Sequence, residues 1–302
     1  MKKEPTIVIG TINFNSEDMT INCLKELEKI SYKNKKIWVL DNGSARESLK
    51  RVELAKSNFK FSLIKLKKNL GYAGGANRLI DAILKKGRPD YILLINNDML
   101  FPDRNFLNKM AQKMENDKSI GIANPIVLTR DNRIQNGGAY LDDYLKYAKR
   151  IYVDVPLKDG PKKDYFVDSY GGCAWLVRSE IFTKEKMRFK DKYFVYCEDE
   201  EFCIRLRKKG YKILVDTSSN VIHLEGVSAN KVGSGFAVYY ITRNEFWMRK
   251  EHATRKQMVI FLFFYFFIFF PKRFIYLIIV KKDINALLSY FKGLRDGLFK
   301  NY

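Results

Sequence analysis

Polar side chains close several of the apolar runs at the start of the chain. Thr11 and Asn13 end the first run, and Asp41 ends the second. If these runs are neighbouring parallel strands, their polar ends meet in one cleft that can hold a nucleobase and ribose. Asp41 could then accept a hydrogen bond from a uracil or thymine N–H, with Thr11 and Asn13 lining the same pocket. The alternative for Asp41-Asn42-Gly43-Ser44 is a turn with a helix cap.

The sequence Asn96-Asn97-Asp98 follows the very apolar run Tyr91–Ile95. A carboxylate at a strand end suits a hard divalent cation, because a nearby diphosphate and water can supply the other ligands. Asp98 is therefore a candidate metal ligand. Taken alone, a tripeptide of this composition is more often a loop.

A run of small residues precedes that strand, Asn69-Leu70-Gly71-Tyr72-Ala73-Gly74-Gly75-Ala76-Asn77. Small residues let the backbone approach a ligand, and a helix that begins here would present free N–H groups to a phosphate. A GxGxxG pattern is absent after the first strand, which disfavours a Rossmann oxidoreductase, and no Gly-Lys-Ser/Thr completes a Walker loop.

Four acids in succession, Glu198-Asp199-Glu200-Glu201, open a predicted helix that runs to Lys209. Acids in a first helical turn are stabilised by the helix dipole, and capping explains two of them more readily than four. A carboxylate held ionised at this place suits a general base. His223 follows the apolar pair Val221-Ile222, where a lone histidine is usually a core or edge residue.

The elements that must position these residues alternate between strand and helix over the first 130 residues. Strands are predicted at Thr6–Ile12, Lys36–Leu40, Phe61–Leu66 and Tyr91–Ile95. The alternation predicts an α/β fold with a mostly parallel, doubly wound sheet. From residue 121 to about 224 the pattern is mixed, with short strand-like runs that include Ile213–Val215 and Val221–Ile222. Since no linker separates the halves, we expect one continuous sheet.

Composition restricts the partners. The chain of 302 residues carries 55 Lys and Arg against 34 Asp and Glu, a formal net charge of +21. This excess implies an anionic partner, either nucleic acid, a phosphorylated substrate or an acidic membrane surface. The four cysteines form no CxxC pair and only two histidines accompany them, which disfavours structural zinc and predicts reduced thiols in a cytosolic protein. The first apolar run is too short for a secretory signal.

Residues 6–250, about four fifths of the chain, resemble the family 2 inverting glycosyltransferases with a GT-A fold, in the branch that includes polysaccharide rhamnosyltransferases. Eight segments match in order. They are Ile9-Gly10-Thr11-Ile12-Asn13, Val39-Leu40-Asp41-Asn42-Gly43-Ser44, the small-residue run 69–77, Leu94-Ile95-Asn96-Asn97-Asp98, Gly171-Gly172-Cys173-Ala174-Trp175-Leu176-Val177-Arg178, Tyr196-Cys197-Glu198-Asp199-Glu200-Glu201-Phe202-Cys203-Ile204-Arg205, Val221-Ile222-His223 and Arg243-Asn244.

The resemblance implies roles for the matching positions. Asp41 corresponds to the nucleobase-binding aspartate, and Asn96-Asn97-Asp98 takes the place of the DXD motif, with an asparagine where the first acid usually stands. Asp98 and His223 are then the protein ligands of Mg²⁺ or Mn²⁺. The nucleotide-binding positions are Thr11, Asn13, Asp41, Asn69, Gly71, Gly74, Asn77, Asn96 and Asn97.

Asp199 resembles the aspartate that deprotonates the acceptor hydroxyl, and Glu198, Glu200 and Glu201 are alternative bases. One displacement at the sugar C1, with the nucleoside diphosphate leaving, inverts the anomeric carbon. The implied donor is a UDP- or dTDP-sugar, and the implied acceptor is a lipid-linked saccharide in cell-surface polysaccharide or glycan biosynthesis. Nothing in the residues separates dTDP-rhamnose from UDP-glucose, UDP-galactose or UDP-N-acetylglucosamine.

Two other classes compete with this interpretation. The basic, aromatic-rich composition allows a nucleic-acid-binding protein, but the chain has no DNA- or RNA-binding module signature and the densest aromatic run carries no interleaved charge. A sugar nucleotidyltransferase would want a Gly-rich basic loop directly after the first strand, and Gly10-Thr11-Ile12-Asn13 lacks one. We therefore expect a glycosyltransferase that does not act on nucleic acid.

The composition changes near the C-terminus. We expect a catalytic domain at 1–253, with a nucleotide-sugar half at 1–120 and an acceptor half at 121–253, followed by a membrane-associating helical region at 254–302. Met258–Phe270 is thirteen consecutive apolar or aromatic residues, which cover roughly 20 Å as a helix and fall short of the ~30 Å membrane core.

We expect Pro271-Lys272-Arg273 to interrupt the apolar run before it continues at Phe274–Val280. The resulting helices would lie in the interface, with their basic flanks on anionic headgroups at the cytoplasmic face of the cell membrane. The alternatives are a buried pair of core helices, a homodimer interface, or a single span over Met258–Val280.

Overall fold

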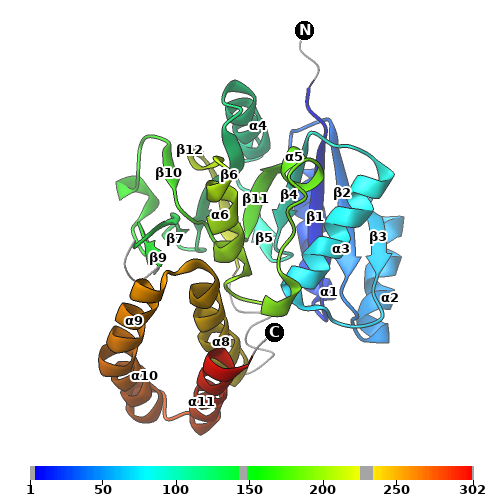
Figure 1. Ribbon diagram of the computed structural model, residues 1–302. Coiled ribbons are helices and arrows are strands. Elements are labelled where there is room, and N and C mark those ends of the chain that lie inside the picture. The colour runs from blue at the N-terminus through cyan, green and yellow to red at the C-terminus, as the bar shows by residue number, and fades with distance from the viewer. Residues whose placement is uncertain (1–3, 143–147, 225–233, 301–302) are drawn as a thin grey trace.

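A ten-stranded mixed sheet forms the centre of the protein, and a layer of C-terminal helices lies below it (Figure 1). The computed structural model describes residues 4–142, 148–224 and 234–300. The strand order is β10-β12-β6-β11-β4-β1-β2-β3, with β5 paired to β12 and β7 paired to β6, and β8 and β9 form a separate hairpin.

The strands have the following bounds. They are β1 Ile7–Asn13, β2 Lys35–Asp41, β3 Ser62–Lys65, β4 Tyr91–Ile95, β5 Met99–Leu100, β6 Ile120–Leu128, β7 Ile134–Asn136, β8 Ala139–Leu141, β9 Ala148–Arg150, β10 Tyr165–Val167, β11 Ala174–Arg178 and β12 Lys212–His223. The α-helices are α1 Glu17–Glu28, α2 Arg46–Leu54, α3 Gly71–Lys86, α4 Phe106–Asn116, α5 Glu180–Thr183, α6 Glu198–Lys208, α8 Ser234–His252, α9 Arg255–Phe264, α10 Phe270–Ile275 and α11 Ile284–Phe299.

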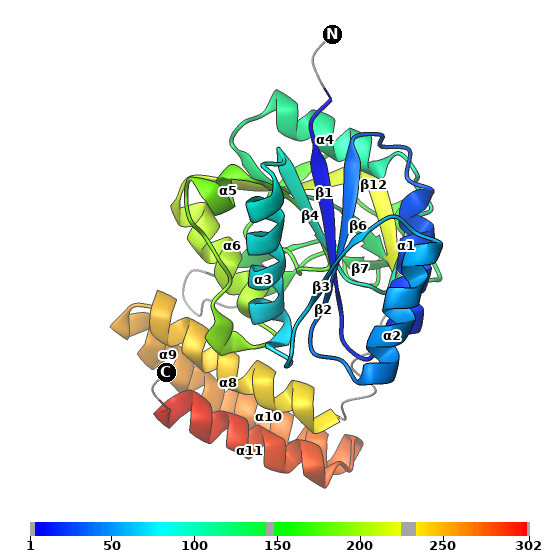
Figure 2. The ribbon, with the colours of Figure 1, turned by 90° about the vertical axis from the view of Figure 1, so that its right-hand side faces the viewer.

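The first half of the sheet is parallel, as the alternation of strands and helices predicts. β1 pairs in parallel with β2 and β4, and β2 pairs in parallel with β3. Figure 2 shows α3 on one side of these strands and α1 and α2 on the other. All five residues of β4 are buried, because this strand lies at the centre of the sheet. The carboxyl ends of β1, β2 and β4 point toward the C-terminal helices (Figure 2).

The second half is mixed and joins the same sheet. β11 runs antiparallel to both β4 and β6, whereas β12 runs parallel to β6. The sequence predicts two short strands at 213–215 and 221–222, but the structure has one strand of 12 residues with a register shift between Asp216 and Asn220. The polar stretch between them stays in the strand because the buried Asp216 carboxylate accepts hydrogen bonds from Ser218 and Ser219.

The apolar tail forms one helix, so the expected break at Pro271 is wrong. α9 continues through a π-helical turn at Tyr265–Phe269 into α10 and a second π-helical turn at Tyr276–Val280. A proline lacks an N–H and crowds the carbonyl one turn earlier. The wider π turn directly before Pro271 is an arrangement in which a helix absorbs such a residue.

The resulting helix, Arg255–Val280, has 26 residues, a mean hydropathy of 1.9 over its most apolar window, and 11% of that window buried. By length and composition it can cross a membrane. One side of it packs on α8 and α11 through Phe261, Tyr265 and Leu277. The other side leaves large side chains exposed, with Val259 at 67% and Phe267 at 70%.

Candidate active site

The strand-end residues divide between the interior and a cavity. Thr11, Asn13 and Asp41 are fully buried, whereas the residues that follow each of them in the chain, Ile12, Phe14 and Asn42, line a cavity of about 750 Å³. Successive side chains of a strand point to opposite faces, so a cavity at the end of the strands meets only alternate residues. We call this the donor cavity.

Asp41 is the centre of a buried hydrogen-bond network beside the donor cavity. Asn13 Nδ2 donates to Asp41 Oδ2 at 2.8 Å, and the Ser44 backbone N–H donates to Asp41 Oδ1 at 3.0 Å. Thr20 Oγ1 in turn donates to Asn13 Oδ1 at 2.8 Å. Thr11 Oγ1 is buried without a hydrogen-bond partner among the described residues. The network joins the ends of β1 and β2, and nucleobase binding by Asp41, Asn13 and Thr11 stays a prediction.

The small-residue run begins α3, but several of its N–H groups are already used. The Leu70 N–H donates to Asn42 Oδ1, the Gly71 N–H to Asn69 Oδ1, and the Ala73 N–H to the Phe194 carbonyl. These three groups are therefore not free for a phosphate, contrary to the expectation from sequence. Asn69 and Gly71 do line the donor cavity.

Position 71 requires a glycine. Its φ is +70°, and a Cβ there would lie 2.3 Å from the Phe194 carbonyl oxygen. Gly74 and Asn77, by contrast, lie in α3 outside the lining of the donor cavity. Asn77 Nδ2 donates to the Phe189 carbonyl at 2.8 Å, and the Phe189 N–H donates back to Asn77 Oδ1 at 2.9 Å. Asn77 therefore ties α3 to the segment that precedes α6.

Asp98 and His223, 125 residues apart in the chain, meet at the donor cavity. β5 pairs with the end of β12 and places Met99 opposite His223. Asp98 Oδ1 lies 3.1 Å from His223 Nε2, and Asn96 Nδ2 lies 3.2 Å from the same nitrogen. Asn97 instead donates to Ser16 Oγ at 2.8 Å and holds the start of α1. The sequence-predicted pair is thus brought together.

The pair fits a divalent cation. His223 Nδ1 lies 2.8 Å from Gln135 Oε1, an acceptor, so Nδ1 carries the proton. In the neutral ring Nε2 then presents a lone pair toward the Asp98 carboxylate. Two neighbouring ligands of an octahedral ion with bonds of about 2.1–2.2 Å are themselves about 3 Å apart, which matches the 3.1 Å separation. Gln135 was not identified from the sequence.

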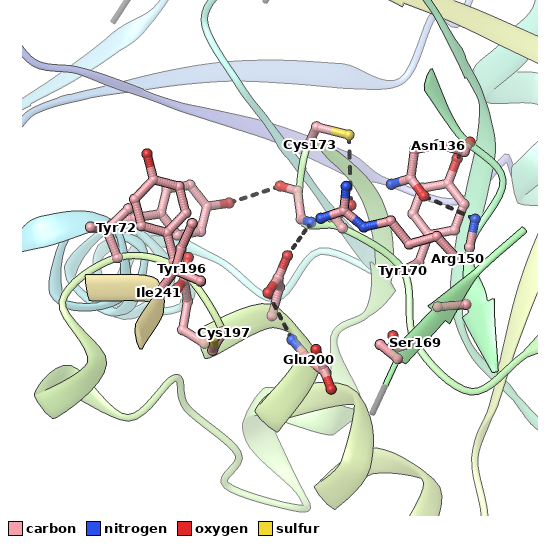
Figure 3. A pocket seen from close by; sticks show the side chains of 18 of the residues that line it. Tyr72, Asn136, Arg150, Ser169, Tyr170, Cys173, Tyr196, Cys197, Glu200 and Ile241 are labelled. Carbon is pink, nitrogen blue, oxygen red and sulfur yellow. Dashed lines mark hydrogen bonds between the residues drawn. The ribbon is translucent and has the colours of Figure 1, made fainter. Parts of the chain in front are cut away.

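Asp199 lines a second cavity, of about 500 Å³. We call it the transfer cavity, and Figure 3 shows side chains that line it. Its Oδ2 accepts the Gly172 N–H at 3.0 Å and its Oδ1 accepts the Glu200 N–H at 2.8 Å, so the carboxylate is held in one orientation. Tyr72 donates its hydroxyl to the Gly172 carbonyl at 3.2 Å and so supports the same segment.

The neighbouring glutamates differ from Asp199 in their surroundings. Burial raises the pKa of Glu198 well above its ordinary value and, with the nearby Asp199 charge, raises the pKa of Glu200 to about 8. The protonated form of both side chains is therefore favoured, and Glu200 is mostly protonated at pH 7. Glu198 Oε2 and Glu200 Oε1 are buried without hydrogen-bond partners among the described residues, which agrees with neutral groups.

Glu201 is held in ion pairs outside the transfer cavity. Burial alone would raise the pKa of its carboxyl, but hydrogen bonds from His252 and Arg205 outweigh burial and lower it to about 2. Ligand atoms of Glu201, Glu251 and His252 lie within 4.8 Å of one another, as in a metal site. Lys190 and Arg205 already pair with Glu201, so this cluster is an ion-pair network that joins α6 to the end of α8. Glu198, Asp199 and Glu200 all line the transfer cavity, and Asp199 is the one whose two carboxylate oxygens accept backbone N–H groups.

Arg243 and Asn244 hold the loop that leads into α6. Asn244 Nδ2 lies 2.8–2.9 Å from the carbonyl oxygens of Tyr193, Val195 and Tyr196. The Arg243 guanidinium also donates a hydrogen bond to the Tyr193 carbonyl, at 3.0 Å. The loop needs support because Phe194, Tyr196 and Cys197 all have φ near +66°. Backbone in this region is costly for residues other than glycine and persists where its surroundings impose it.

Several cavity residues gave no signal in the sequence. Phe194, Phe236 and Tyr240 form an aromatic wall of the donor cavity, with Phe194 and Tyr240 stacked at 5.2 Å between ring centroids. In the transfer cavity, Arg150 reaches from β9 toward the centre while Tyr72 and Tyr196 lie opposite (Figure 3). Tyr72 and Tyr196 belong to segments that were singled out in the sequence, whereas Arg150 comes from a hairpin, Phe194 from a loop, and Phe236 and Tyr240 from α8, where spacing rules for strand ends do not apply.

The two cavities share a boundary. Five residues line both, and they include the proposed metal ligand. They are Tyr72, Asn96, Val195, Tyr196 and His223. A molecule in the donor cavity can therefore present one end to Asp199 in the transfer cavity.

Two curated proteins are similar to this chain over most of its length. The low-salt glycan biosynthesis hexosyltransferase Agl10 of Haloferax volcanii is 23% identical over 236 residues, which are 78% of this chain and 72% of that protein. The amylovoran biosynthesis glycosyltransferase AmsB of Erwinia amylovora is 25% identical over 260 residues, which are 81% of this chain and 78% of that protein.

Solved structures resemble the fold. The mannosyltransferase PcManGT from Pyrobaculum calidifontis, in complex with GDP-Man and Mn²⁺, aligns with a TM-score of 0.58 at 10% identity, covering 100% of this chain and 89% of that chain. GalNAc-T7 with UDP, GalNAc and Mn²⁺ also aligns at 0.58, with 15% identity, and covers 74% of this chain, which spans 44% of that protein. These likenesses confirm the GT-A type of sheet.

The model of one protein family matches residues 7–183, from β1 through α5. The match covers more than half of the chain and includes the strand ends, the small-residue run and Asp98. The chain therefore belongs to glycosyl transferase family 2.

Proposed function

We propose that this protein is a metal-dependent, inverting hexosyltransferase that moves a sugar from a UDP- or dTDP-linked donor to a hydroxyl of a lipid-linked saccharide. The observation that carries the proposal is the adjacency of two sites. A carboxylate–imidazole pair 3.1 Å apart borders the donor cavity, and an oriented carboxylate, Asp199, lines the transfer cavity that adjoins it. Hexosyltransferase and glycan biosynthesis relatives support this class of reaction.

The donor cavity suits a nucleotide sugar. Phe14 and the aromatic wall of Phe194, Phe236 and Tyr240 offer apolar surface to a base, and Asn42 and Asn69 offer amides at its rim. Two structural neighbours were solved with Mn²⁺ and with UDP or GDP-Man. Asp98 and His223 would hold Mg²⁺ or Mn²⁺, which as a Lewis acid neutralises the charge that develops on a diphosphate leaving group.

Asp199 then acts as the general base. An acceptor hydroxyl in the transfer cavity gives its proton to the Asp199 carboxylate while its oxygen attacks C1 of the sugar from the face opposite the diphosphate. The C1–oxygen bond to the nucleoside diphosphate breaks in the same step, so the anomeric configuration inverts. The raised pKa of Glu198 and of Glu200 favours the protonated form of each side chain, so we assign the role to Asp199.

The tail supports a place at a membrane surface. Exposed aromatic and aliphatic side chains on α9 and α10, such as Phe263 and Phe267, lie between basic residues at both ends of the helix, Lys256 and Lys281. The apolar side suits the acyl boundary of the bilayer, and the cations suit anionic headgroups. A cytoplasmic, membrane-bound enzyme would meet both a soluble donor and a lipid-linked acceptor.

The test uses the full-length protein in nonionic detergent. Thermal stabilisation by UDP-glucose, UDP-galactose, UDP-N-acetylglucosamine, dTDP-rhamnose and GDP-mannose is measured with Mn²⁺ and with EDTA. We expect one uracil- or thymine-containing donor to raise the Tm only when the metal is present, and its transfer product to have the inverted anomeric configuration by NMR. Metal-independent stabilisation, or a retained configuration, would contradict the proposal.

A further inference from the structure

A third cavity lies among the C-terminal helices. Its volume is about 580 Å³, and the residues that line it come from α8, the α9–α10 helix and α11. Figure 1 shows these helices together below the sheet. Aromatic side chains form much of its wall, among them Phe261, Tyr265, Phe269 and Tyr290. We call it the tail cavity.

The charges that line the tail cavity are unbalanced. Three cations, Arg249, Lys272 and Arg273, border it together with one carboxylate, Glu245. Arg249 is 3% exposed and stacks on the Phe261 ring at 4.1 Å, so its charge is fixed inside the protein. Lys272 and Arg273 are exposed residues that border the cavity, and among the described residues neither is found in an ion pair. The cavity therefore presents a net positive charge within apolar walls.

The tail cavity continues the row of substrate cavities. Ile241 and Glu245, one turn apart on α8, line both the tail cavity and the transfer cavity. On its outer side the same α9–α10 helix exposes Phe263 and Phe267. A ligand in the tail cavity can thus extend toward Asp199 at one end and toward a lipid phase at the other.

We propose that the tail cavity binds the phosphate of the lipid that carries the acceptor saccharide, with Lys272 and Arg273 as its phosphate contacts. The inference rests on the proposed function and names the binding site of its acceptor. The cations complement a phosphate, the aromatic walls complement the first part of an apolar chain, and the saccharide lies in the transfer cavity. A lysine and an arginine within an apolar helix, costly in lipid, are explained by this contact.

The test compares the binding of farnesyl diphosphate and farnesol to the full-length protein by calorimetry in nonionic detergent. The pocket variant is Lys272→Gln with Arg273→Gln. The control variant, Lys281→Gln with Lys282→Gln, removes the same charge at the end of the same helix but outside the cavity lining. We expect the native protein and the control to prefer the diphosphate by tenfold or more, and the pocket variant to lose about tenfold of that preference.

Three results would overturn the inference. They are equal binding of the diphosphate and the alcohol by the native protein, equal losses in pocket and control variants, and binding of inorganic pyrophosphate as tight as that of farnesyl diphosphate. The last would identify a site for free phosphate. The calorimetry uses no donor sugar, so its outcome does not depend on the donor-binding and transfer experiments. The lipid-phosphate site and the proposed function can therefore be refuted separately.

Discussion

Replacing Asp199 and Glu200 by their amides separates the candidate base from its neighbour. Both acids lie in the first turn of α6, and both line the transfer cavity. Asp199→Asn removes the carboxylate that would take the acceptor proton, whereas Glu200→Gln replaces a group whose pKa of about 8 keeps it mostly protonated at pH 7. The two changes are matched in chemistry, so they should differ in effect only if the roles differ.

The magnitudes follow from these surroundings. Loss of a general base typically costs about 10²–10⁴ in rate. The amide introduced by Asp199→Asn would also turn an N–H donor toward either the Gly172 or the Glu200 N–H, which costs about 1–3 kcal/mol of stability. Glu200, with a pKa of about 8, is ionised in only about one molecule in ten at pH 7, so Glu200→Gln should change kcat less than about twofold.

Glu200 also gives a pH signature. Its carboxyl keeps its proton in the folded protein up to pH about 8, whereas in the unfolded chain it loses the proton near its ordinary value of 4.5. A rise in pH from 4.5 to 8 therefore lowers the free energy of unfolding, by up to about 5 kcal/mol in all. Glu200→Gln should remove the part of this decline that Glu200 causes, while the part from Glu198 stays, and the variant should gain stability over the native protein as pH rises from 5 to 8.

The assay measures kcat for transfer, the dissociation constant of the donor and the Tm at several pH values for each variant. Asp199→Asn should keep donor binding and lose turnover, and Glu200→Gln should keep both. If Asp199→Asn retained more than a tenth of the native kcat while Glu200→Gln lost a hundredfold, Glu200 would be the base. A Tm decline with pH that is as steep in Glu200→Gln as in the native protein would refute the raised pKa of Glu200.

Three further predictions concern other parts of the protein. Asp98→Ala should abolish Mn²⁺-dependent donor binding and His223→Ala should weaken it about tenfold or more, and full activity in excess EDTA would contradict both. Asn244→Ala should lower the free energy of unfolding by about 3 kcal/mol in denaturant titrations and also reduce kcat, because it releases the strained loop before α6. Phe263→Gln with Phe267→Gln should move the protein from the membrane pellet to the supernatant, and unchanged sedimentation would refute membrane binding through this face.

The parallel half of the sheet could be predicted because each strand is a local pattern. Tyr91–Ile95 is five apolar residues in a row, and the structure begins and ends β4 at the same residues. Whether a polar residue at a strand end faces a ligand depends on which face of the sheet its side chain points to, and this alternates from one residue to the next. Ile12, not Thr11, and Asn42, not Asp41, line the donor cavity, although each pair is adjacent in sequence.

Other features depend on contacts between distant segments. The four acids of α6 are equivalent in sequence, and only burial and the neighbours that each meets separate Asp199 from Glu198, Glu200 and Glu201. Gln135, which fixes the proton on His223, comes from β7, 88 residues earlier. Pro271 indicates a helix break by local rules, but the π turn at Tyr265–Phe269 absorbs it.

The helix α8 links the active site to the tail, because one side of it contacts the loop before α6 and the other side packs against the apolar helix. Asn244 holds the loop before α6, while Phe246 packs against Phe261 and Tyr265 of the apolar helix. Ile241 and Glu245 form the wall between the transfer cavity and the tail cavity. A displacement of the apolar helix when it inserts into a lipid surface would therefore move α8, which it contacts through Phe246. Because Asn244 of α8 holds the loop before α6, this movement would change the position of Asp199. On this reasoning kcat should depend on the lipid surface, and the dependence should weaken in Asn244→Ala.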